Sequence, residues 1–282
     1  MKFPVKYMNG NYQVTILDDG TKIRYTPDRE LLPSRPETMD INISNYCENN
    51  CPWCYINASV DGKHGNLNLK FFDTIAPFTE IAINYAKHPD LENFLVRMRD
   101  RQVIVNLTIN QKDFNKDWAK LLDWQISDMF CGLGISINGD NITKKIDYFD
   151  NVVAHTIYGI TTMESYKWAA QMFDKVLVLG YKNKGRGKKI TPKLGMDVSE
   201  LFSLFNIVSF DNLGIDQSEV KGKINEGDWK TYYMGEEGTS SFYIDTVEAK
   251  FYESSISEVG FDIEDKSVKD MFKNIRGEKN DI

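Results

Sequence analysis

The sequence has few cysteines, no long apolar run and no excess of positive charge. A membrane-spanning helix needs about 18 consecutive apolar residues, and every apolar run in this sequence is much shorter. Residues 1–6 lack the apolar stretch of a signal peptide. The net charge of −7 argues against a broad nucleic-acid surface. Its 4 cysteines are interpreted as unpaired thiols, so the expected location is the reducing cytoplasm, without a membrane or nucleic-acid partner.

Three of the cysteines lie close together. Cys47, Cys51 and Cys54 follow a C-x3-C-x2-C spacing, here called the cysteine loop (residues 47–54), and such a thiolate triad typically holds a metal. Zinc usually needs a fourth protein ligand, which no second C-x2-C or H-x3-H pair supplies. The spacing therefore favours a [4Fe–4S] cluster with one open iron. A zinc knuckle or a redox loop is the alternative, and Cys131, in an apolar segment, is expected to be a core residue.

The order of predicted elements indicates an α/β protein. Residues 1–36 are predicted as an appendage containing a β-hairpin, with strands over 12–17 and 22–26, that packs on the edge of the main sheet. Residues 37–217 form the main domain, in which strands alternate with helices. Strands are predicted over 38–44, 78–84, 102–109, 130–137, 151–157, 175–179 and 207–210, and helices over 69–77, 90–101, 115–128, 142–149, 164–173 and 198–205.

This alternation predicts a parallel sheet with right-handed crossovers. The cysteine loop follows the first strand at its carboxyl end, the end that carries the active site in parallel α/β barrels. Residues 218–282, with one long strand predicted over 242–252, are interpreted as a C-terminal extension that caps the open side of the barrel.

The cysteine spacing, with the aromatic Trp53 just before the last cysteine, resembles the signature of the radical SAM superfamily. The resemblance covers about residues 38–211 and implies a partial (β/α)6 barrel. It also implies that S-adenosylmethionine (SAM) binds the open iron and that an electron from the cluster breaks its sulfonium bond. The resulting 5′-deoxyadenosyl radical would abstract a hydrogen atom from a substrate. An electron donor such as flavodoxin or ferredoxin is implied as a partner.

The resemblance further implies cofactor contacts from Trp53 and SAM contacts at the strand ends. Asn84 and Tyr85 stand where the family has a Gly-Gly-Glu-Pro-like segment, and they are assigned to the SAM amino group although the glycines and the acid are missing. Asn106, Ser136 and Asn138 are small polar residues at strand ends that suit the SAM carboxylate and ribose hydroxyls. Ordinary capping of strand ends is the alternative.

Basic residues follow the sixth predicted strand. Gly185 and Gly187 free the backbone around Arg186, which is expected to contact the SAM carboxylate or a substrate anion with its guanidinium. A solvated basic loop is the alternative. Lys182 lies nearer the strand end and is expected to face the cavity. His155, among apolar residues of the fifth strand, is interpreted as a core histidine with satisfied hydrogen bonds.

Acidic and aromatic residues of the last third are assigned to a substrate. Asp211, Asp216, Tyr243 and Asp245 suit the donor edge and the ring of a planar heterocycle, whereas an Asp after a strand is often only a turn former. Within the superfamily, the small barrel, single cluster and short cap most resemble queuine lyase and phage-type relatives. That resemblance implies a lyase that cleaves queuine to a 7-aminomethyl-7-deazaguanine in queuosine salvage. A glycyl-radical activating enzyme and a non-catalytic zinc-binding interaction module are the alternatives.

Overall fold

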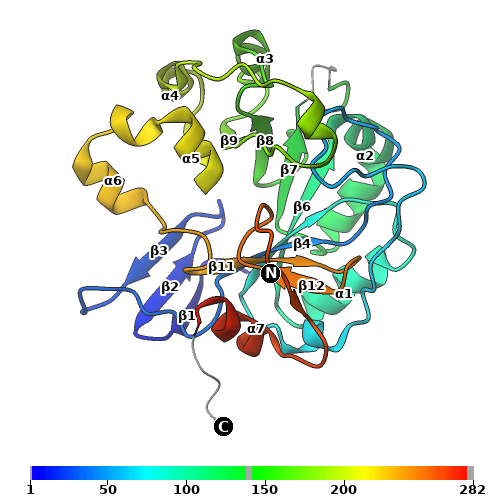
Figure 1. Cartoon of the computed structure of the whole chain (residues 1–282), viewed down its shortest axis with the longest axis vertical. Coiled ribbons are helices and arrows are strands. Elements are labelled where there is room, and N and C mark those ends of the chain that lie inside the picture. Colours follow the sequence, from blue (N-terminus) through cyan, green and yellow to red (C-terminus); the bar gives the residue numbers. More distant parts are fainter. Residues whose placement is uncertain (1, 138–141, 278–282) are drawn as a thin grey trace.

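The protein is built around one large, curved and mostly parallel sheet, as the computed structural model of residues 2–137 and 142–277 shows (Figure 1). The strand order is β10-β9-β8-β7-β6-β5-β4-β11-β12-β13. From β4 to β10, strands that follow one another in the chain are neighbours and pair in parallel. Such an order differs from that of a doubly wound sheet, in which the strand order reverses. The predicted α/β class with a parallel sheet is confirmed.

Eight strands of this sheet run in parallel. They are β4 (Thr38–Asn42), β5 (Glu80–Asn84), β6 (Ile104–Asn110), β7 (Gly132–Ser136), β8 (Val152–Ile157), β9 (Lys175–Leu179), β10 (Ile207–Phe210) and β11 (Ser241–Asp245). The last of these, β11, pairs in parallel with β4. Two antiparallel strands, β12 (Lys250–Tyr252) and β13 (Phe261–Asp262), complete that edge.

The single long strand predicted over 242–252 is wrong, because residues 246–249 form a turn between β11 and β12. The Asp245 carboxylate accepts hydrogen bonds from the backbone N–H groups of Val247 (2.9 Å) and Glu248 (3.0 Å). A side chain that binds the backbone two residues ahead favours a turn over a continued strand. Residues 218–282, predicted as a cap, therefore also supply three strands of the main sheet.

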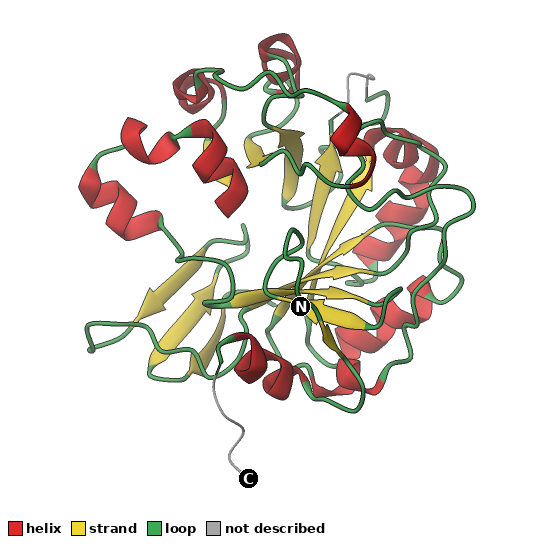
Figure 2. Ribbon diagram, in the orientation of Figure 1, coloured by secondary structure: helices red, strands yellow, loops and turns green. Residues whose placement is uncertain are grey.

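The helices lie mainly on the outer side of the curved sheet (Figure 2). They are α1 (Leu91–Asp100), α2 (Gln111–Ile126), α3 (Met163–Ala169), α4 (Leu201–Leu204), α5 (Asn212–Ser218), α6 (Glu226–Tyr232) and α7 (Val268–Ile275), with 3-10 turns η1 (Lys70–Thr74), η2 (Gly185–Lys189), η3 (Val198–Glu200) and η4 (Val220–Lys223). In the described part of the chain, no helix has the length and apolar character needed to cross a bilayer.

The helix predicted over 142–149 is wrong. Those residues form bends and turns whose backbone groups bind side chains of α2. The Trp118 indole N–H donates to the Lys145 carbonyl (2.8 Å), and the Asn115 side chain accepts from the Thr143 N–H (2.9 Å). Tertiary partners thus replace the hydrogen bonds that a helix would have made.

The N-terminal segment forms a second, three-stranded antiparallel sheet of β1 (Val5–Asn9), β2 (Tyr12–Ile16) and β3 (Lys22–Tyr25). The predicted hairpin is confirmed, and β1 was missed. The expected position on the edge of the main sheet is wrong. Lys22 pairs with Glu80 at the start of β5, and Lys175 at the start of β9 donates to the Asp19 carbonyl (2.8 Å). The small sheet therefore covers the amino-terminal ends of the strands, opposite the cysteine loop.

Glu37 is the buried charge between the two sheets, with a side chain 1% exposed. It accepts hydrogen bonds from the Tyr12 hydroxyl (2.6 Å) and from Arg24 Nε (2.9 Å) and Nη2 (2.6 Å). Burial by itself would raise the pKa of Glu37, but Arg24 and Lys22 hold it below the usual value. The carboxylate is therefore stabilised mainly by Arg24.

Replacing Arg24 with Met is expected to lower the free energy of unfolding by about 2–3 kcal/mol, because it leaves the Glu37 charge buried with Lys22, 3.8 Å away, as its remaining cation. Urea denaturation near neutral pH measures the loss. The matched control, Arg29→Met on the exposed part of the same segment, should stay within about 0.5 kcal/mol of the parent. The loss should shrink in acid, where Glu37 becomes protonated. Equal stabilities of the two variants would contradict the role of Arg24.

Candidate functional site

The cysteine loop begins just beyond the carboxyl end of β4, and the neighbouring strand β5 holds its start. The Asn84 side chain accepts a hydrogen bond from the Ile43 N–H (2.9 Å) and donates one to the Ser44 carbonyl (3.0 Å). Further along, the Cys47 N–H donates to the Ser59 carbonyl (2.9 Å) and closes the base of the loop. Asn84 was assigned to the SAM amino group, but both ends of its side-chain amide bind the backbone that leads into the loop.

The three thiols are half-buried and share one environment. The Ala58 N–H points at Cys54 Sγ (3.4 Å) and the Asn110 side-chain amide at Cys51 Sγ (3.7 Å). Burial raises the pKa of the Cys51 thiol, and the neighbouring Cys47 and Cys54 raise it further. Sulfur atoms that accept N–H donors in a partly buried loop are suited to being metal-bound thiolates, because the donors stabilise the charge.

The positions of the cysteine sulfurs decide which kinds of metal group the loop could hold. Within residues 2–137 and 142–277, no group of three or more His, Cys, Asp or Glu side chains converges closely enough to hold one metal ion. A [4Fe–4S] cluster makes a different demand, because each cysteine binds a different iron atom and the sulfurs need not meet at one point. A cluster held by the three thiols of the loop alone would have one iron without a protein ligand.

The Gly-Arg-Gly turn (residues 185–187), after β9, lies against the cysteine loop. The Arg186 N–H donates to the Cys54 carbonyl (3.0 Å), its Nε to the Cys51 carbonyl (2.9 Å) and its Nη1 to the Ala58 carbonyl (2.8 Å). The guanidinium was expected to bind a SAM or substrate carboxylate, with a solvated loop as the alternative. Two of its nitrogens hold the backbone of the cysteine loop, so the segment is not a freely solvated loop. The contact with a SAM or substrate carboxylate stays a prediction.

The inner face of the sheet, which is the face turned away from the helices, is polar and open. Along β4, Met39 and Ile41 point outward and are at most 2% exposed, whereas Asp40 between them is exposed. Burial alternates in the same way along β5 and β6. Closed (β/α)8 barrels fill this interior with branched apolar side chains. Here Asp40, Asn106 and Ser136 line it, and all three remain accessible to solvent.

Four charged residues form what we call the inner charged cluster: Asp40 of β4, Lys182 after β9, Asp211 after β10 and Glu237 before β11. Burial would lower the pKa of Lys182, but Tyr55 and the three carboxylates raise it above the usual value. The pKa of Glu237 is raised to about 7, by burial and then by the charges of Asp40 and Asp211. The excess of negative charge favours a ligand that is cationic or rich in N–H donors.

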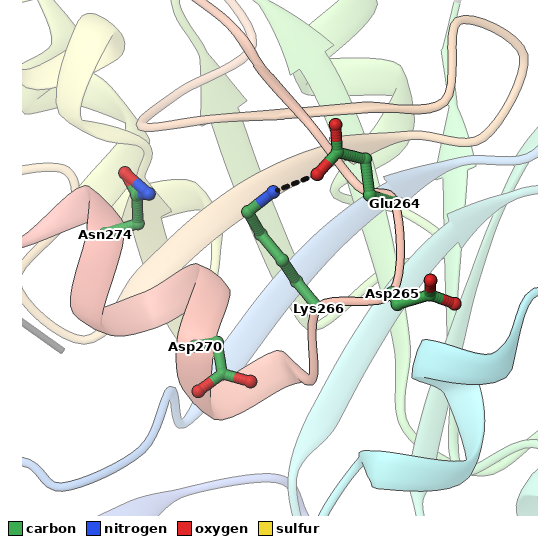
Figure 3. Close-up of a pocket in the computed structure, with 5 residues that line it drawn as sticks. All are labelled: Glu264, Asp265, Lys266, Asp270 and Asn274. Carbon is green, nitrogen blue, oxygen red and sulfur yellow. Dashed lines mark hydrogen bonds and ion pairs between the residues drawn. The ribbon is translucent and has the colours of Figure 1, made fainter. Parts of the chain in front are cut away.

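No family model and no curated protein matches the chain. The functional assignment therefore rests on the inner face and the cysteine loop. A separate surface hollow of about 540 Å³ lies beside α7 (Figure 3). Its lining residues are Glu264, Asp265, Lys266, Asp270 and Asn274, and none of them belongs to the strand ends near the cysteine loop.

Three of the five predicted substrate residues come together. Lys182 and Asp211 belong to the inner charged cluster, and the Tyr243 ring lies on the inner face beside Tyr55, where burial raises its pKa. Asp211 is also a turn former, since its Oδ1 accepts from the N–H groups of Gly180 (2.7 Å) and Gly214 (2.6 Å). This leaves its other oxygen for the interior.

The other two predicted substrate residues are placed elsewhere. Asp216 is exposed on α5. Asp245 is buried, and besides forming the β11–β12 turn it accepts a hydrogen bond from the Asn42 side chain (3.0 Å). Asp245 therefore stabilises the sheet and has little capacity left for a substrate.

The predicted SAM residues separate into distinct places. Tyr85 donates its hydroxyl to Asp117 (2.8 Å) and lines a small hollow beside Cys47. Asn106 and Ser136 lie on the inner face of β6 and β7, as expected for strand-end contacts. A Cβ at Gly132 would stand 2.6 Å from Asn106 Oδ1, so this glycine makes room for the amide.

Trp53 and Asn138 complete the set of residues predicted to contact the cofactor. Trp53 is half-buried in the cysteine loop, with its carbonyl near the Gly-Arg-Gly turn. Asn138 lies outside the described residues.

His155 is not a satisfied core histidine, contrary to the prediction. It lies on the inner face of β8 opposite Ser136, and within the described part of the chain its buried Nδ1 has no hydrogen-bond partner. Burial lowers the pKa of His155 to about 4, so the ring is neutral at pH 7. A Cβ at Gly134 would stand 2.2 Å from the His155 ring, which explains the glycine.

The sequence analysis missed Asp40, Tyr55 and Glu237. Asp40 had a usable signal, because a charged residue between apolar neighbours of a predicted inner strand must point into the interior. Tyr55 directly follows the cysteine loop, where an aromatic side chain close to the chemistry could have been considered. Glu237 lies in a glycine-rich turn, and nothing in its local sequence indicates an inward position.

Proposed function

We propose that the chain is a radical SAM enzyme that acts on a small molecule inside the curved sheet. The observation that carries this proposal is the position of the cysteine loop, which follows the first strand of a parallel series above an open and polar inner face. Cys47, Cys51 and Cys54 would hold a [4Fe–4S] cluster. When bound, the cluster and SAM would supply a 5′-deoxyadenosyl radical, with electrons from a flavodoxin or ferredoxin.

The chain's own groups would bind and orient the ligands. Asn84 and Arg186 fix the backbone of the cysteine loop from two sides. Asn106 and Ser136 offer hydrogen-bonding groups on the inner face for the SAM carboxylate and ribose, and Asn138 retains the same assignment. The neutral His155 offers an unpaired ring nitrogen to a ligand.

The inner charged cluster supports a substrate with several N–H donors. Queuine carries such groups on N1 and the 2-amino nitrogen of its deazaguanine ring, and its side-chain amine is cationic at neutral pH. The carboxylates of Asp40, Asp211 and Glu237 can accept from these donors, and Tyr55 and Tyr243 provide aromatic rings beside them. We therefore propose queuine as the substrate, cleaved to a 7-aminomethyl-7-deazaguanine.

Anaerobic reconstitution with iron and sulfide tests the proposal. The protein should turn brown with thiolate-to-iron charge-transfer absorption, and after reduction it should convert SAM to 5′-deoxyadenosine. A parallel sample incubated with zinc alone should stay colourless and inactive. A protein that holds zinc tightly and forms no cluster under either condition would refute the enzyme proposal and support the zinc-binding module.

Queuine should then stimulate formation of 5′-deoxyadenosine and yield the 7-aminomethyl-7-deazaguanine, detected by mass spectrometry. Guanine, which has the donor edge but no side chain to cleave, is the matched control ligand. If queuine neither binds nor stimulates SAM cleavage, the lyase assignment fails while the radical SAM assignment stands.

A further inference from the structure

The Gly-Arg-Gly turn binds the cysteine loop and the segment that follows it (residues 55–58). Its contacts reach Cys51 and Cys54 in the loop and Ala58 in the following segment, all within 3.0 Å. Two of these contacts come from a charged guanidinium, and hydrogen bonds from a charged donor are stronger than neutral ones. The Arg186 side chain, from a distant part of the sequence, therefore connects the cysteine loop to the segment that follows it.

The glycines are required for this approach. Gly185 has φ +54°, and a Cβ there would stand 2.6 Å from the Cys54 carbonyl oxygen and 2.5 Å from the Tyr55 carbonyl oxygen. On the other side of the turn, the Tyr181 hydroxyl donates to the Gly187 carbonyl and, at 3.2 Å, to the Ile190 carbonyl. The Tyr181 hydroxyl therefore stabilises the turn independently of its contacts with the cysteine loop.

The same segment also reaches the inner charged cluster. Tyr55 is the residue that follows the last cysteine, and Lys182 Nζ lies 4.3 Å from the centre of its ring. The same ammonium group donates a hydrogen bond to Ser255 Oγ (2.7 Å). The cation–π contact of Lys182 with Tyr55 and the hydrogen bonds of Arg186 therefore hold neighbouring residues at the end of the cysteine loop.

We propose that Arg186 is a positioning residue that holds the cysteine loop in its ligand-ready conformation before any metal is bound. Only the purpose of that conformation rests on the proposed function. The contacts belong to the metal-free chain, so they can be tested without a cluster, SAM or substrate.

The test measures modification of each cysteine in the reduced, metal-free, full-length protein by iodoacetamide, followed by peptide mass spectrometry. In Arg186→Ala, Cys51 and Cys54 should react about tenfold or more faster than in the parent, because lost charged hydrogen bonds increase local opening. Cys131 should react at an unchanged rate. The matched control is Lys188→Ala, an exposed residue of the same charge two positions on.

Whether Arg186→Ala speeds or slows cysteine modification distinguishes loss of loop positioning from simple loss of a positive charge. Loss of a nearby positive charge alone would favour the thiol over the reactive thiolate and slow the modification. Faster reaction therefore reports an opened loop. Arg186→Lys keeps the charge but cannot span the Cys51 and Ala58 carbonyls as a planar fork, so it should give intermediate rates.

Parent-like rates at Cys51 and Cys54 in a folded Arg186→Ala protein would overturn the proposal. If Arg186→Ala does not fold, as a rise in the Cys131 rate would reveal, Arg186→Lys decides: faster modification supports the proposal and parent-like rates reject it. Failure of the parent protein to form a cluster would refute the proposed function without changing these rates.

Discussion

A Cys51→Ala variant is expected to assemble no [4Fe–4S] cluster and to form no 5′-deoxyadenosine, whereas Cys131→Ala should match the parent in both. The cysteine loop supplies three thiols, so loss of one would leave two irons of a [4Fe–4S] cluster without cysteine ligands. Iron and sulfide content, the charge-transfer absorbance and 5′-deoxyadenosine formation measure the outcome. We expect the rate of 5′-deoxyadenosine formation to fall by more than about a thousandfold, because cleavage of SAM requires an electron from an intact cluster.

Cys131 is a suitable control because it lies far from the cysteine loop, although it is half-buried like the loop cysteines. It immediately precedes β7, at the end of the sheet opposite the cysteine loop, and packs against the apolar group that joins the two sheets. Burial raises its pKa to about 11, so it is a thiol at neutral pH and a poor metal ligand. A Cys51→Ala protein with parent-like iron content and SAM cleavage would refute the ligand assignment. Thermal denaturation of both variants shows whether any loss reflects misfolding.

The order of strands β4 to β10 and the position of the cysteine loop could be predicted because both depend on local patterns, whereas the pairing of β11 with β4 was not predicted. A strand followed by a helix leaves few topologies open, and each right-handed crossover places the next strand beside the last. The hairpin of residues 12–25 followed from its turn residues. The missed turn at 246–249 shows the limit of such patterns, since alternation alone does not distinguish one long strand from two short ones.

The partners of the site residues could not be predicted in the same way. Arg186 meets Cys51, 135 residues earlier in the chain, and that contact depends on how far the sheet curves between β4 and β9. Asn84 illustrates the same point, because its place at a strand end was foreseen while its hydrogen bonds to the loop backbone were not. Sequence patterns predict which face a residue occupies, whereas its partners depend on register and curvature.

Replacing Asp40 with Asn is expected to weaken queuine binding about 100-fold while leaving cluster content unchanged. The substitution keeps the size of the side chain but removes a carboxylate that has no hydrogen bond or ion pair with any described residue and faces the open interior. A hydrogen bond to a charged group contributes about 1.5–3 kcal/mol, which corresponds to roughly 10- to 150-fold in affinity. Calorimetry with the oxidised, cluster-loaded protein measures binding without turnover. Asp216→Asn, an exposed acid on α5, is the matched control and should bind like the parent.

The pH dependence of binding gives the same prediction a second readout. In the parent, binding should weaken as the pH falls through about 7, because Glu237 takes up a proton there and loses its charge. Asp40 is one of the charges that raise this pKa, so Asp40→Asn should lower it and move the loss of binding to more acidic pH. Asp216 is not among the main causes of the raised Glu237 pKa, and its Asn variant should keep the parent profile. Equal affinity and an unmoved profile in Asp40→Asn would show that the substrate binds outside the inner charged cluster, even if the protein cleaves SAM.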